Sequence, residues 1–518
     1  MKAYRLIAVI ATGLVASVTL ADFPQWRGPS GNGVVDEAFS RWDKDKGPEK
    51  LWTSPEIPGD GDGGFASPVC VDGKVFLFVN DKYKIPFEHR KLDGRGFDKL
   101  GGQILDLSDQ AIRQIEAIRT SEQLDQLDRK QRDEYIEKKL AAIFPKPDEQ
   151  KKQIKVAQRR IQAGSKAIEL AELKALKEIV GRKFDSQAAL EEWLKTARIS
   201  QETQRAAFKQ IPTASDAAKD RILCLDGRTG KTLWEKQYEG RHRGWATSST
   251  PAVADGKLYV GGSGGKLYCL QASDGKELWV TDAGGAEINS SPVLLGGRVF
   301  IQAGRLMAFD VGDGRKLYQI DEAKNRNTSP VVWKTDEADY ILTNAGGKLF
   351  CIKPENGAVL WTAPGGGTSS PAVSGDHCAI VTNNKAEGLI AYKLSPDRAE
   401  VLWKSDATQD RGASAVIHDG FVYAVTKSDA VCVHLASGQV AWKVRARGDG
   451  FSSPLIADGK IVAITGRNVT IFDGSPKQGG KQLAGARLLP LRCTSPAMAD
   501  GKLLLRTKTN LVCYKLPE

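Results

Sequence analysis

The sequence is poor in the residues that build metal and redox centres. Its 518 residues include only five histidines and three methionines, and no two cysteines are adjacent or form a Cys-x-x-Cys pair. The histidines show no metal-ligand spacing to one another or to a cysteine, and the c-type haem attachment motif is absent. No P-loop or dinucleotide-binding fingerprint occurs either. We therefore expect no bound cofactor.

Long apolar runs are confined to the N-terminus. Lys2 and Arg5 form a positive region, an apolar stretch follows from Leu6 to Leu20, and Ala21 completes a small-residue cleavage site. This order is typical of a signal peptide, and the stretch is short for a membrane span. We predict a signal peptide over residues 1–21 and a soluble, exported protein, periplasmic or extracellular, without a membrane span.

The charge balance is basic. The net charge is +11 and the isoelectric point is about 9.1, which favours anionic partners. Export argues against nucleic acid as that partner. We expect a monomer that binds a protein partner or an anionic ligand in the cell envelope.

A Ser-Pro-type opening recurs eight times along the chain, and from Pro251 onward it recurs every 38 to 44 residues. A period near 40 to 45 residues with four short strands per unit is typical of a β-propeller. The openings end at Pro68, Pro251, Pro292, Pro330, Pro371, Ala415, Pro454 and Pro496.

Turn and aromatic residues define four strands, A to D, in each unit. Asp-Gly pairs such as Asp255-Gly256 separate apolar runs, which indicates hairpins. The outermost strand D carries an aromatic residue in six units, whereas the seventh has Ala484 and the eighth ends before its strand D. Leu51-Trp52 supplies the missing strand. The sequence therefore predicts an all-β, eight-bladed propeller closed by an N-terminal strand.

About 140 residues interrupt the first blade, and in them the apolar period changes from 2 to the 3.6 of a helix. Ser108 and Asp185 are expected helix N-caps. We predict a helical insertion that serves as a lid or docking arm; the alternative is a tolerated loop without a role. The predicted parts are the signal peptide at 1–21, the closing strand and first half of blade 1 at 22–80, the insertion at 81–219, and the remaining blades at 220–518.

Five of the eight cysteines occupy one position of strand C. Equivalent positions of neighbouring sheets are about 10 Å apart, which is too far for a disulfide. We expect these cysteines to be free, buried packing residues: Cys224, Cys269, Cys351, Cys432 and Cys513.

Five linkers that lead into strand A carry arginine. Because successive strands of a sheet reverse direction, all five linkers lie on one face of the ring. The guanidinium fork suits carboxylate, sulfate or phosphate groups; the alternative is that these arginines are merely solvated. The expected ligand-binding rim comprises Arg243, Trp245, Arg326, Arg411, Arg447 and Arg492.

Units such as Ser249-Thr250-Pro251 through Tyr259-Val260 to Leu278-Trp279 resemble the PQQ-like propeller repeat. The opening Gln25-Trp26-Arg27-Gly28-Pro29 is similar to the mature start of exported members. The family includes quinoprotein alcohol dehydrogenases, which bind pyrroloquinoline quinone and Ca²⁺, and scaffolds such as the BamB lipoprotein. This chain lacks the adjacent cysteines of the dehydrogenases, and it has no lipid-anchoring cysteine after the expected cleavage site.

The resemblance favours a non-catalytic binding or scaffold protein similar to BamB. Two alternatives stay open: a quinone-dependent dehydrogenase using pyrroloquinoline quinone and calcium, and a protein or enzyme that acts on an anionic glycan at the channel mouth.

Overall fold

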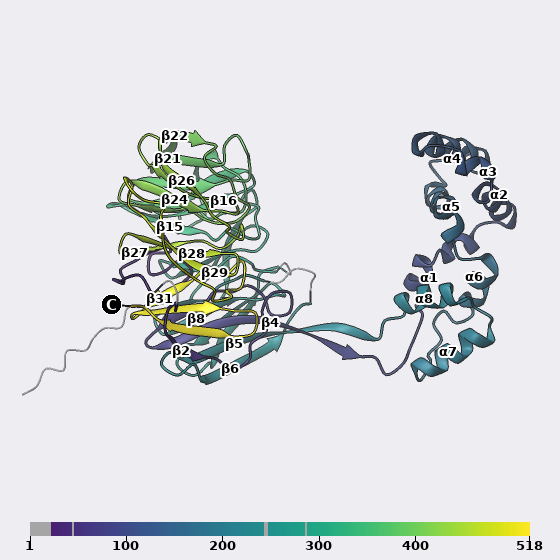
Figure 1. Ribbon diagram of the computed structural model, residues 1–518, viewed down its shortest axis with the longest axis horizontal. Coiled ribbons are helices and arrows are strands. Elements are labelled where there is room, and N and C mark those ends of the chain that lie inside the picture. The colour runs from purple at the N-terminus through teal and green to yellow at the C-terminus, as the bar shows by residue number, and fades with distance from the viewer. Residues whose placement is uncertain (1–21, 44–45, 243–246, 285–286, 518) are drawn as a thin grey trace, which may run out of the picture. The chain divides into compact units, whose positions relative to one another are not determined.

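The computed structural model describes residues 22–43, 46–242, 247–284 and 287–517. The chain divides into two compact units (Figure 1). The segment Lys84–Asp216 forms a helical unit, and the parts of the chain before and after it form the other unit. Each unit is described here by itself.

The larger unit is a β-propeller, as the repeat predicts. Its described residues form eight sheets, seven of four strands and one of five, and consecutive strands are neighbours within each sheet. The first four sheets comprise β3 (Val69–Val71), β4 (Lys74–Pro86), β5 (Ala214–Asp226) and β6 (Thr232–Glu239); β7 (Ala252–Ala254), β8 (Lys257–Gly261), β9 (Lys266–Gln271) and β10 (Glu277–Asp282); β11 (Val293–Leu295), β12 (Arg298–Gln302), β13 (Leu306–Asp310) and β14 (Lys316–Ile320); and β15 (Val331–Lys334), β16 (Asp339–Ala345), β17 (Lys348–Ile352) and β18 (Val359–Pro364).

The other four sheets follow the same order along the chain. They comprise β19 (Ala372–Ser374), β20 (His377–Val381), β21 (Leu389–Ser395) and β22 (Arg398–Ser405); β23 (Val416–His418), β24 (Phe421–Val425), β25 (Asp429–His434) and β26 (Val440–Arg445); β27 (Leu455–Ala457), β28 (Lys460–Thr465), β29 (Asn468–Asp473) and β30 (Gln482–Ala486), with β1 (Val34–Val35) added; and β31 (Ala497–Ala499), β32 (Lys502–Arg506) and β33 (Leu511–Lys515), completed by β2 (Lys50–Thr53).

The last sheet joins the two ends of the chain. β2 pairs antiparallel with β33, and Trp52 lies opposite Cys513. This pairing confirms the predicted N-terminal closing strand, and it covers the edge that β33 would otherwise expose.

The Ser or Thr of each Ser-Pro-type opening joins a closed ring of hydrogen bonds. In each case the backbone N–H donates to the hydroxyl of the equivalent residue in the next sheet, and the last donor, Ser495, reaches the hydroxyl of Ser67 at 2.8 Å. All eight members are buried. The ring runs Ser67, Thr250, Ser291, Ser329, Ser370, Ser414, Ser453, Ser495 and back to Ser67.

The outer strands are joined by aromatic side chains. The Trp234 indole N–H donates to the Ala272 carbonyl of the next sheet at 3.2 Å, and five other tryptophans make the equivalent bond. Gly275 has φ 73° and lies against the Trp234 indole, and an added Cβ would stand 2.6 Å from that indole. Ala484 leaves the seventh position without an aromatic residue, and the buried Phe39 and Trp42 belong to the same apolar cluster as Ala484.

The five cysteines of strand C are buried and free, as predicted. Each lies opposite the tryptophan of its neighbouring strand; Cys269 pairs with Trp279, for example. Burial raises the pKa of the Cys269 thiol to about 12. Because the thiolate is the reactive form, these cysteines act as small packing residues.

The helical unit has its own apolar core, which includes Ile115, Leu173 and Leu194. Ser108 caps its helix as predicted; Ser186, and not the predicted Asp185, caps the helix that begins at Gln187, because its hydroxyl accepts from Ala189 N at 3.1 Å. The helices are α1 (Gly94–Lys99), α2 (Asp109–Arg119), α3 (Glu122–Asp125), α4 (Arg129–Ile143), α5 (Lys151–Ala163), α6 (Leu170–Lys177), α7 (Gln187–Thr196) and α8 (Gln201–Gln210), with the 3-10 turns η1 (Gly102–Asp106) and η2 (Gly164–Lys166).

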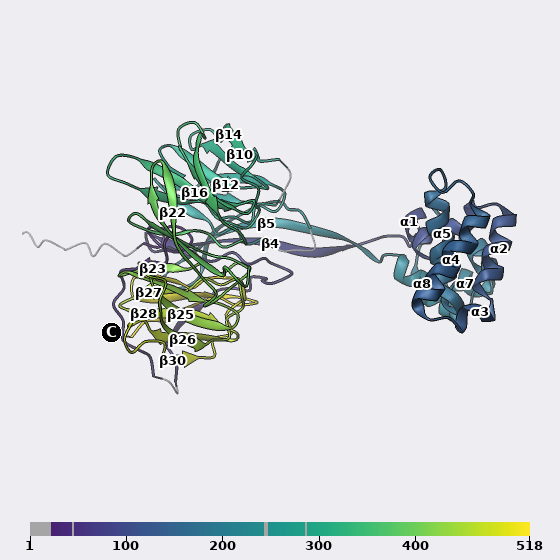
Figure 2. The ribbon, with the colours of Figure 1, turned by 90° about the horizontal axis from the view of Figure 1, so that it is seen from above.

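β4 and β5 are long strands that lie side by side (Figure 2). Both extend past Asn80 and Asp220, where the predicted boundaries 81–219 lie. The buried Asp220 carboxylate accepts hydrogen bonds from the Asn80 amide at 3.1 Å, the Ser263 N–H at 2.8 Å and the Tyr268 hydroxyl at 3.0 Å. This cluster ties the first two sheets together at the base of the strand pair.

Loss of one ring hydroxyl should weaken the propeller. Ser414→Ala leaves the buried N–H of Ser370 without its acceptor at 2.9 Å, which should lower the free energy of unfolding by about 1–3 kcal/mol. Denaturant titration measures this change. Ser428→Ala removes an exposed hydroxyl for which no hydrogen bond is found in the described chain, so it should change stability by less than about 0.5 kcal/mol. Equal losses in both variants would contradict a special role for the ring.

The propeller should fold without the helical unit. Replacing residues 84–216 by Asn-Gly joins two paired strands with a hairpin turn and keeps Asn80 and Asp220 in place. We expect a β-type circular dichroism spectrum and one cooperative melting transition. A shortened protein without cooperative melting would show that the helices belong to the folding unit of the propeller.

Candidate functional site

Linkers between the outer strand of one sheet and the inner strand of the next form a rim at one end of the sheets. Neighbouring linkers contact each other: Asn289 donates to the Asn327 side chain at 3.0 Å, and Cys493 N donates to Asp449 at 2.6 Å. Thr368 likewise donates to the Arg411 carbonyl. The rim is therefore a connected surface, and four of the predicted site residues lie in its linkers.

These four arginines differ in their partners. Arg326 forms an ion pair of 3.8 Å with Glu287, and Arg492 forms one of 3.1 Å with Asp60. Arg411 and Arg447 are exposed, and in the described part of the chain their side chains have no ion-pair partner. Arg243 and Trp245, the other two predicted site residues, lie outside the described residues.

Two carboxylates of the rim accept hydrogen bonds from backbone N–H groups. Asp410 is 6% exposed and accepts from Arg411 N at 2.6 Å and Lys427 N at 3.0 Å. Asp449 accepts from Ser452 N at 2.7 Å and from Cys493 N. Both carboxylates therefore stabilise the linkers through backbone hydrogen bonds. Neither forms an ion pair with the described side chains of Arg411 and Arg447.

The N-terminal segment Phe23–Val35 lies along the innermost strands. Phe23 exchanges backbone hydrogen bonds with Cys70, and Val253 N donates to the Pro24 carbonyl at 2.8 Å. Farther along, β1 pairs parallel with β27. Three inner strand edges of the propeller are thus covered by one segment of the chain. Gly33 has φ 83°, and an added Cβ would stand 2.7 Å from Val416, so this close approach requires glycine.

Arg27 anchors the segment. Its guanidinium is fully buried and donates to the carbonyls of Asn32 at 2.9 Å, Pro371 at 3.4 Å and Ala415. Burial lowers its pKa below the usual value for arginine. Next to it, the Trp26 indole donates to the Ser495 hydroxyl of the ring at 3.3 Å. The segment is therefore attached both to the inner strands and to the ring.

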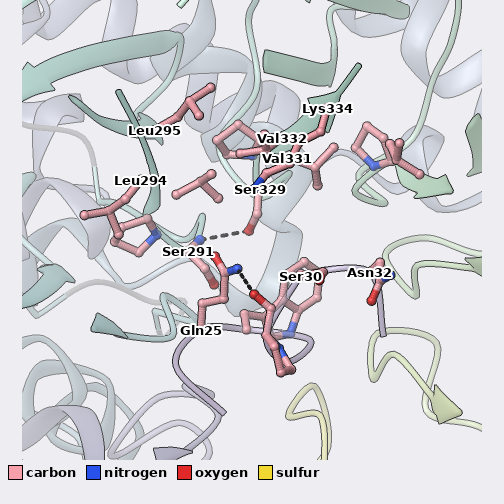
Figure 3. Close-up of a pocket in the computed structure, with 18 of the residues that line it drawn as sticks. Gln25, Ser30, Asn32, Ser291, Leu294, Leu295, Ser329, Val331, Val332 and Lys334 are labelled. Carbon is pink, nitrogen blue, oxygen red and sulfur yellow. Dashed lines mark hydrogen bonds between the residues drawn. The ribbon is translucent and has the colours of Figure 1, made fainter. Parts of the chain in front are cut away.

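A cavity of about 460 Å³ remains beside this segment. Figure 3 shows Gln25, Ser30 and Asn32 on one side of it and residues of β11 and β15 on the other. Its wall also includes Ser374, the last residue of β19, and Gly375 of the turn that follows, so the cavity lies toward the opposite end of the inner strands from the rim. Lys334 is the one charged residue among those that line it.

The lining offers hydroxyl, amide and backbone groups together with valine and leucine side chains. None of its described residues is a histidine, cysteine, aspartate, glutamate or tyrosine. Within the described residues, no three His, Cys, Asp or Glu side chains are grouped to hold a metal ion. None of the described helices has the length and apolarity needed to span a bilayer. The arrangement suits the binding of an uncharged or anionic ligand.

The role of Arg27 and of the N-terminal segment was missed from the sequence. In the sequence, the motif Gln25–Gly33 indicates only a start similar to that of exported family members. The glycines and the single arginine of this motif could have indicated a segment packed against other strands, because glycines with positive φ allow the chain to approach other strands closely.

A family model described as outer membrane protein assembly factor BamB matches residues 218–395 and 386–514. These matches cover more than half of the chain and follow its repeat. The protein belongs to this family of PQQ-like repeat propellers.

Individual relatives are distant. The chain is 26% identical over 206 residues to outer membrane protein assembly factor BamB of Shewanella oneidensis, covering 35% of this chain and 50% of that protein. It is 24% identical over 246 residues to BamB of Burkholderia pseudomallei, covering 43% and 62%. It is 25% identical over 216 residues to the quinoprotein alcohol dehydrogenase PedH of Pseudomonas putida, covering 36% and 32%. The chain thus spans about half of the BamB relatives' length.

Among solved structures, BamB of Moraxella catarrhalis matches 57% of this chain and 88% of its own, with a TM-score of 0.46 and 16% identity.

Removal of the Arg27 guanidinium should loosen the N-terminal segment. Arg27→Met leaves three carbonyls without a donor, so we expect faster proteolytic cleavage between residues 22 and 35 and a loss of about 2 kcal/mol or more in unfolding free energy. Arg41→Met changes an exposed arginine nearby and should alter neither quantity. Unchanged cleavage in Arg27→Met would show that the segment is held without this side chain.

Proposed function

We propose that this protein is an exported, non-catalytic binding scaffold of the cell envelope, built on an eight-bladed propeller that β2 closes. The family match over residues 218–395 and 386–514 carries this proposal. The relatives named above as assembly factors support a role in the assembly of outer-membrane proteins. Because the chain spans only part of their length, the partner is inferred from the family and not from a matched binding site.

The rim is the proposed contact surface for that partner. Arg411 and Arg447 are exposed cations that need no reorganisation of an existing ion pair before they bind a carboxylate. The buried Asp410 carboxylate and the partly buried Asp449 carboxylate hold the linkers through hydrogen bonds from backbone N–H groups. Arg243, Trp245, Arg326 and Arg492 extend the proposed surface, with an acidic protein surface or another anionic ligand as its partner.

A quinone-dependent dehydrogenase is the second candidate, because a quinoprotein alcohol dehydrogenase is among the relatives. The sequence has no adjacent cysteines, and the residues that line the cavity beside the N-terminal segment supply no carboxylate for Ca²⁺. The residues present therefore do not fit pyrroloquinoline quinone with calcium, and the binding role is preferred.

A complementation experiment tests the scaffold role. In the producing bacterium, deletion of the gene should lower the amount of folded outer-membrane β-barrel protein in the envelope fraction. The full chain should restore this amount. The double variant Arg411→Gln with Arg447→Gln should restore it only in part, because it loses the electrostatic attraction to an anionic partner, which salt screens. The recovered protein should begin at Asp22.

Arg228→Gln with Lys276→Gln makes the same charge change in turns after the third strands of two sheets, and it should complement fully. A deletion strain with normal outer-membrane proteins would overturn the assembly role. Purified protein that retains stoichiometric pyrroloquinoline quinone through gel filtration would overturn the non-catalytic role.

A further inference from the structure

The helical unit contains a cleft of about 580 Å³ between three helices. α1, α5 and α8 supply most of its lining, and the turns η1 and η2 with the residues that follow α1 and η2 supply the rest. All of the lining residues belong to the helical unit, so the cleft exists independently of the propeller.

Helical spacing explains how two faces meet at this cleft. On α5, Val156, Arg159 and Ala163 follow an i, i+3, i+7 pattern, which places them on one face. On α8, Glu202, Arg205 and Lys209 follow the same pattern. Each helix therefore presents a single continuous stripe to the cleft, with arginine at its centre.

The wall is rich in cations that have no ion-pair partner among the described residues. Five exposed basic side chains line it, and in the described part of the chain none of them forms an ion pair or a side-chain hydrogen bond. They are Lys99, Arg159, Lys166, Arg205 and Lys209. Asp98 and Glu202 are the acidic residues of the lining, so cations outnumber carboxylates there.

Arg160 also lines the cleft but is already neutralised. It is buried, and its Nε donates to Glu116 at 2.7 Å. Burial raises the pKa of Glu116, but the hydrogen bonds from Arg160 and Arg119 more than offset this and hold the pKa below its usual value. This paired arginine supports the wall, and the unpaired cations are left for a ligand.

Helix ends explain only some of these cations. Lys99 and Lys209 stand in the last turns of α1 and α8, where a positive charge stabilises the helix carbonyls. Arg159 and Arg205 stand before the last turns of their helices. They have no such role, and each lies next to an apolar part of the lining.

The apolar part of the lining includes Leu100, Val156, Ile168 and Ala206. A ligand that fills the cleft must therefore combine carboxylates with apolar side chains. The lining has no aromatic residue, so it lacks the stacking surface by which single-stranded nucleic acids are bound.

We propose that this cleft binds an acidic, amphipathic segment of a partner polypeptide. Carboxylates of the segment pair with Arg159 and Arg205, and its apolar side chains cover Val156 and Ile168. The proposal concerns the helical unit alone and stands independently of the function proposed for the propeller rim.

Fluorescence anisotropy with the full chain tests it. The probe is a labelled synthetic peptide of glutamate and leucine, and the matched peptide has glutamine in place of glutamate. The acidic peptide should bind, with affinity that falls at ~0.5 M salt because exposed charges are screened, and the neutral peptide should not. Arg159→Gln with Arg205→Gln should weaken binding by ~10-fold or more.

Arg113→Gln with Arg129→Gln is the matched control, because both arginines are exposed, lie in the same unit and are absent from the lining. It should keep affinity within ~2-fold, and both double variants should melt like the unchanged protein. Equal losses in the two variants, binding of the neutral peptide or indifference to salt would overturn the proposal. Binding to phosphatidylglycerol vesicles that depends on Arg159 and Arg205, without peptide binding, would also overturn it in favour of a lipid surface.

Discussion

The propeller depends on one repeated interaction, the hydrogen bond from a backbone N–H to the hydroxyl of the equivalent residue in the next sheet. Each bond contributes only about 1 kcal/mol, but the bonds are buried and form a closed cycle, so one cannot lengthen without displacing its neighbours. The cycle closes where Ser495 meets Ser67, residues 428 positions apart. The residue that follows each member is proline in seven sheets and Ala415 in one, and proline favours the extended backbone that starts an inner strand.

The ring also separates two environments along the inner strands. The rim linkers precede it and carry exposed arginines, whereas the cavity beside the N-terminal segment follows it. Trp26 donates to a ring hydroxyl, and Arg27 holds carbonyls that directly follow two ring residues. The N-terminal segment thus uses polar groups that the inner strands would otherwise leave unpaired, and its residues form one wall of the cavity.

The repeat predicted the sheets well because its signals are local. Asp-Gly turns, the cysteine position and the closing strand at Trp52 each depend on a few neighbouring residues, or on comparison with another copy of the same unit. The parallel pairing of β1 with β27 was not predictable in this way. Two valines are too few to show the alternation of apolar and polar residues that indicates a strand, and their partner strand lies more than 400 residues later. The same limit applies to Glu287 and Asp60, whose pairing with rim arginines depends on how linkers approach in space. Phe39 and Trp42 belong to the cluster around Ala484, and no repeat could indicate them.

The position of the helical unit has a consequence for folding kinetics. β4 and β5 are neighbours in the first sheet, but the unfolded chain between them forms a long loop whose closure costs entropy. Contacts within helices are local and form fast. Once the helical unit has folded, Phe87 and Thr213 share a backbone hydrogen bond, and the two strands emerge from it already close together. The insertion therefore brings together the halves of the sheet that it interrupts, and it makes a distant strand pairing kinetically similar to a hairpin.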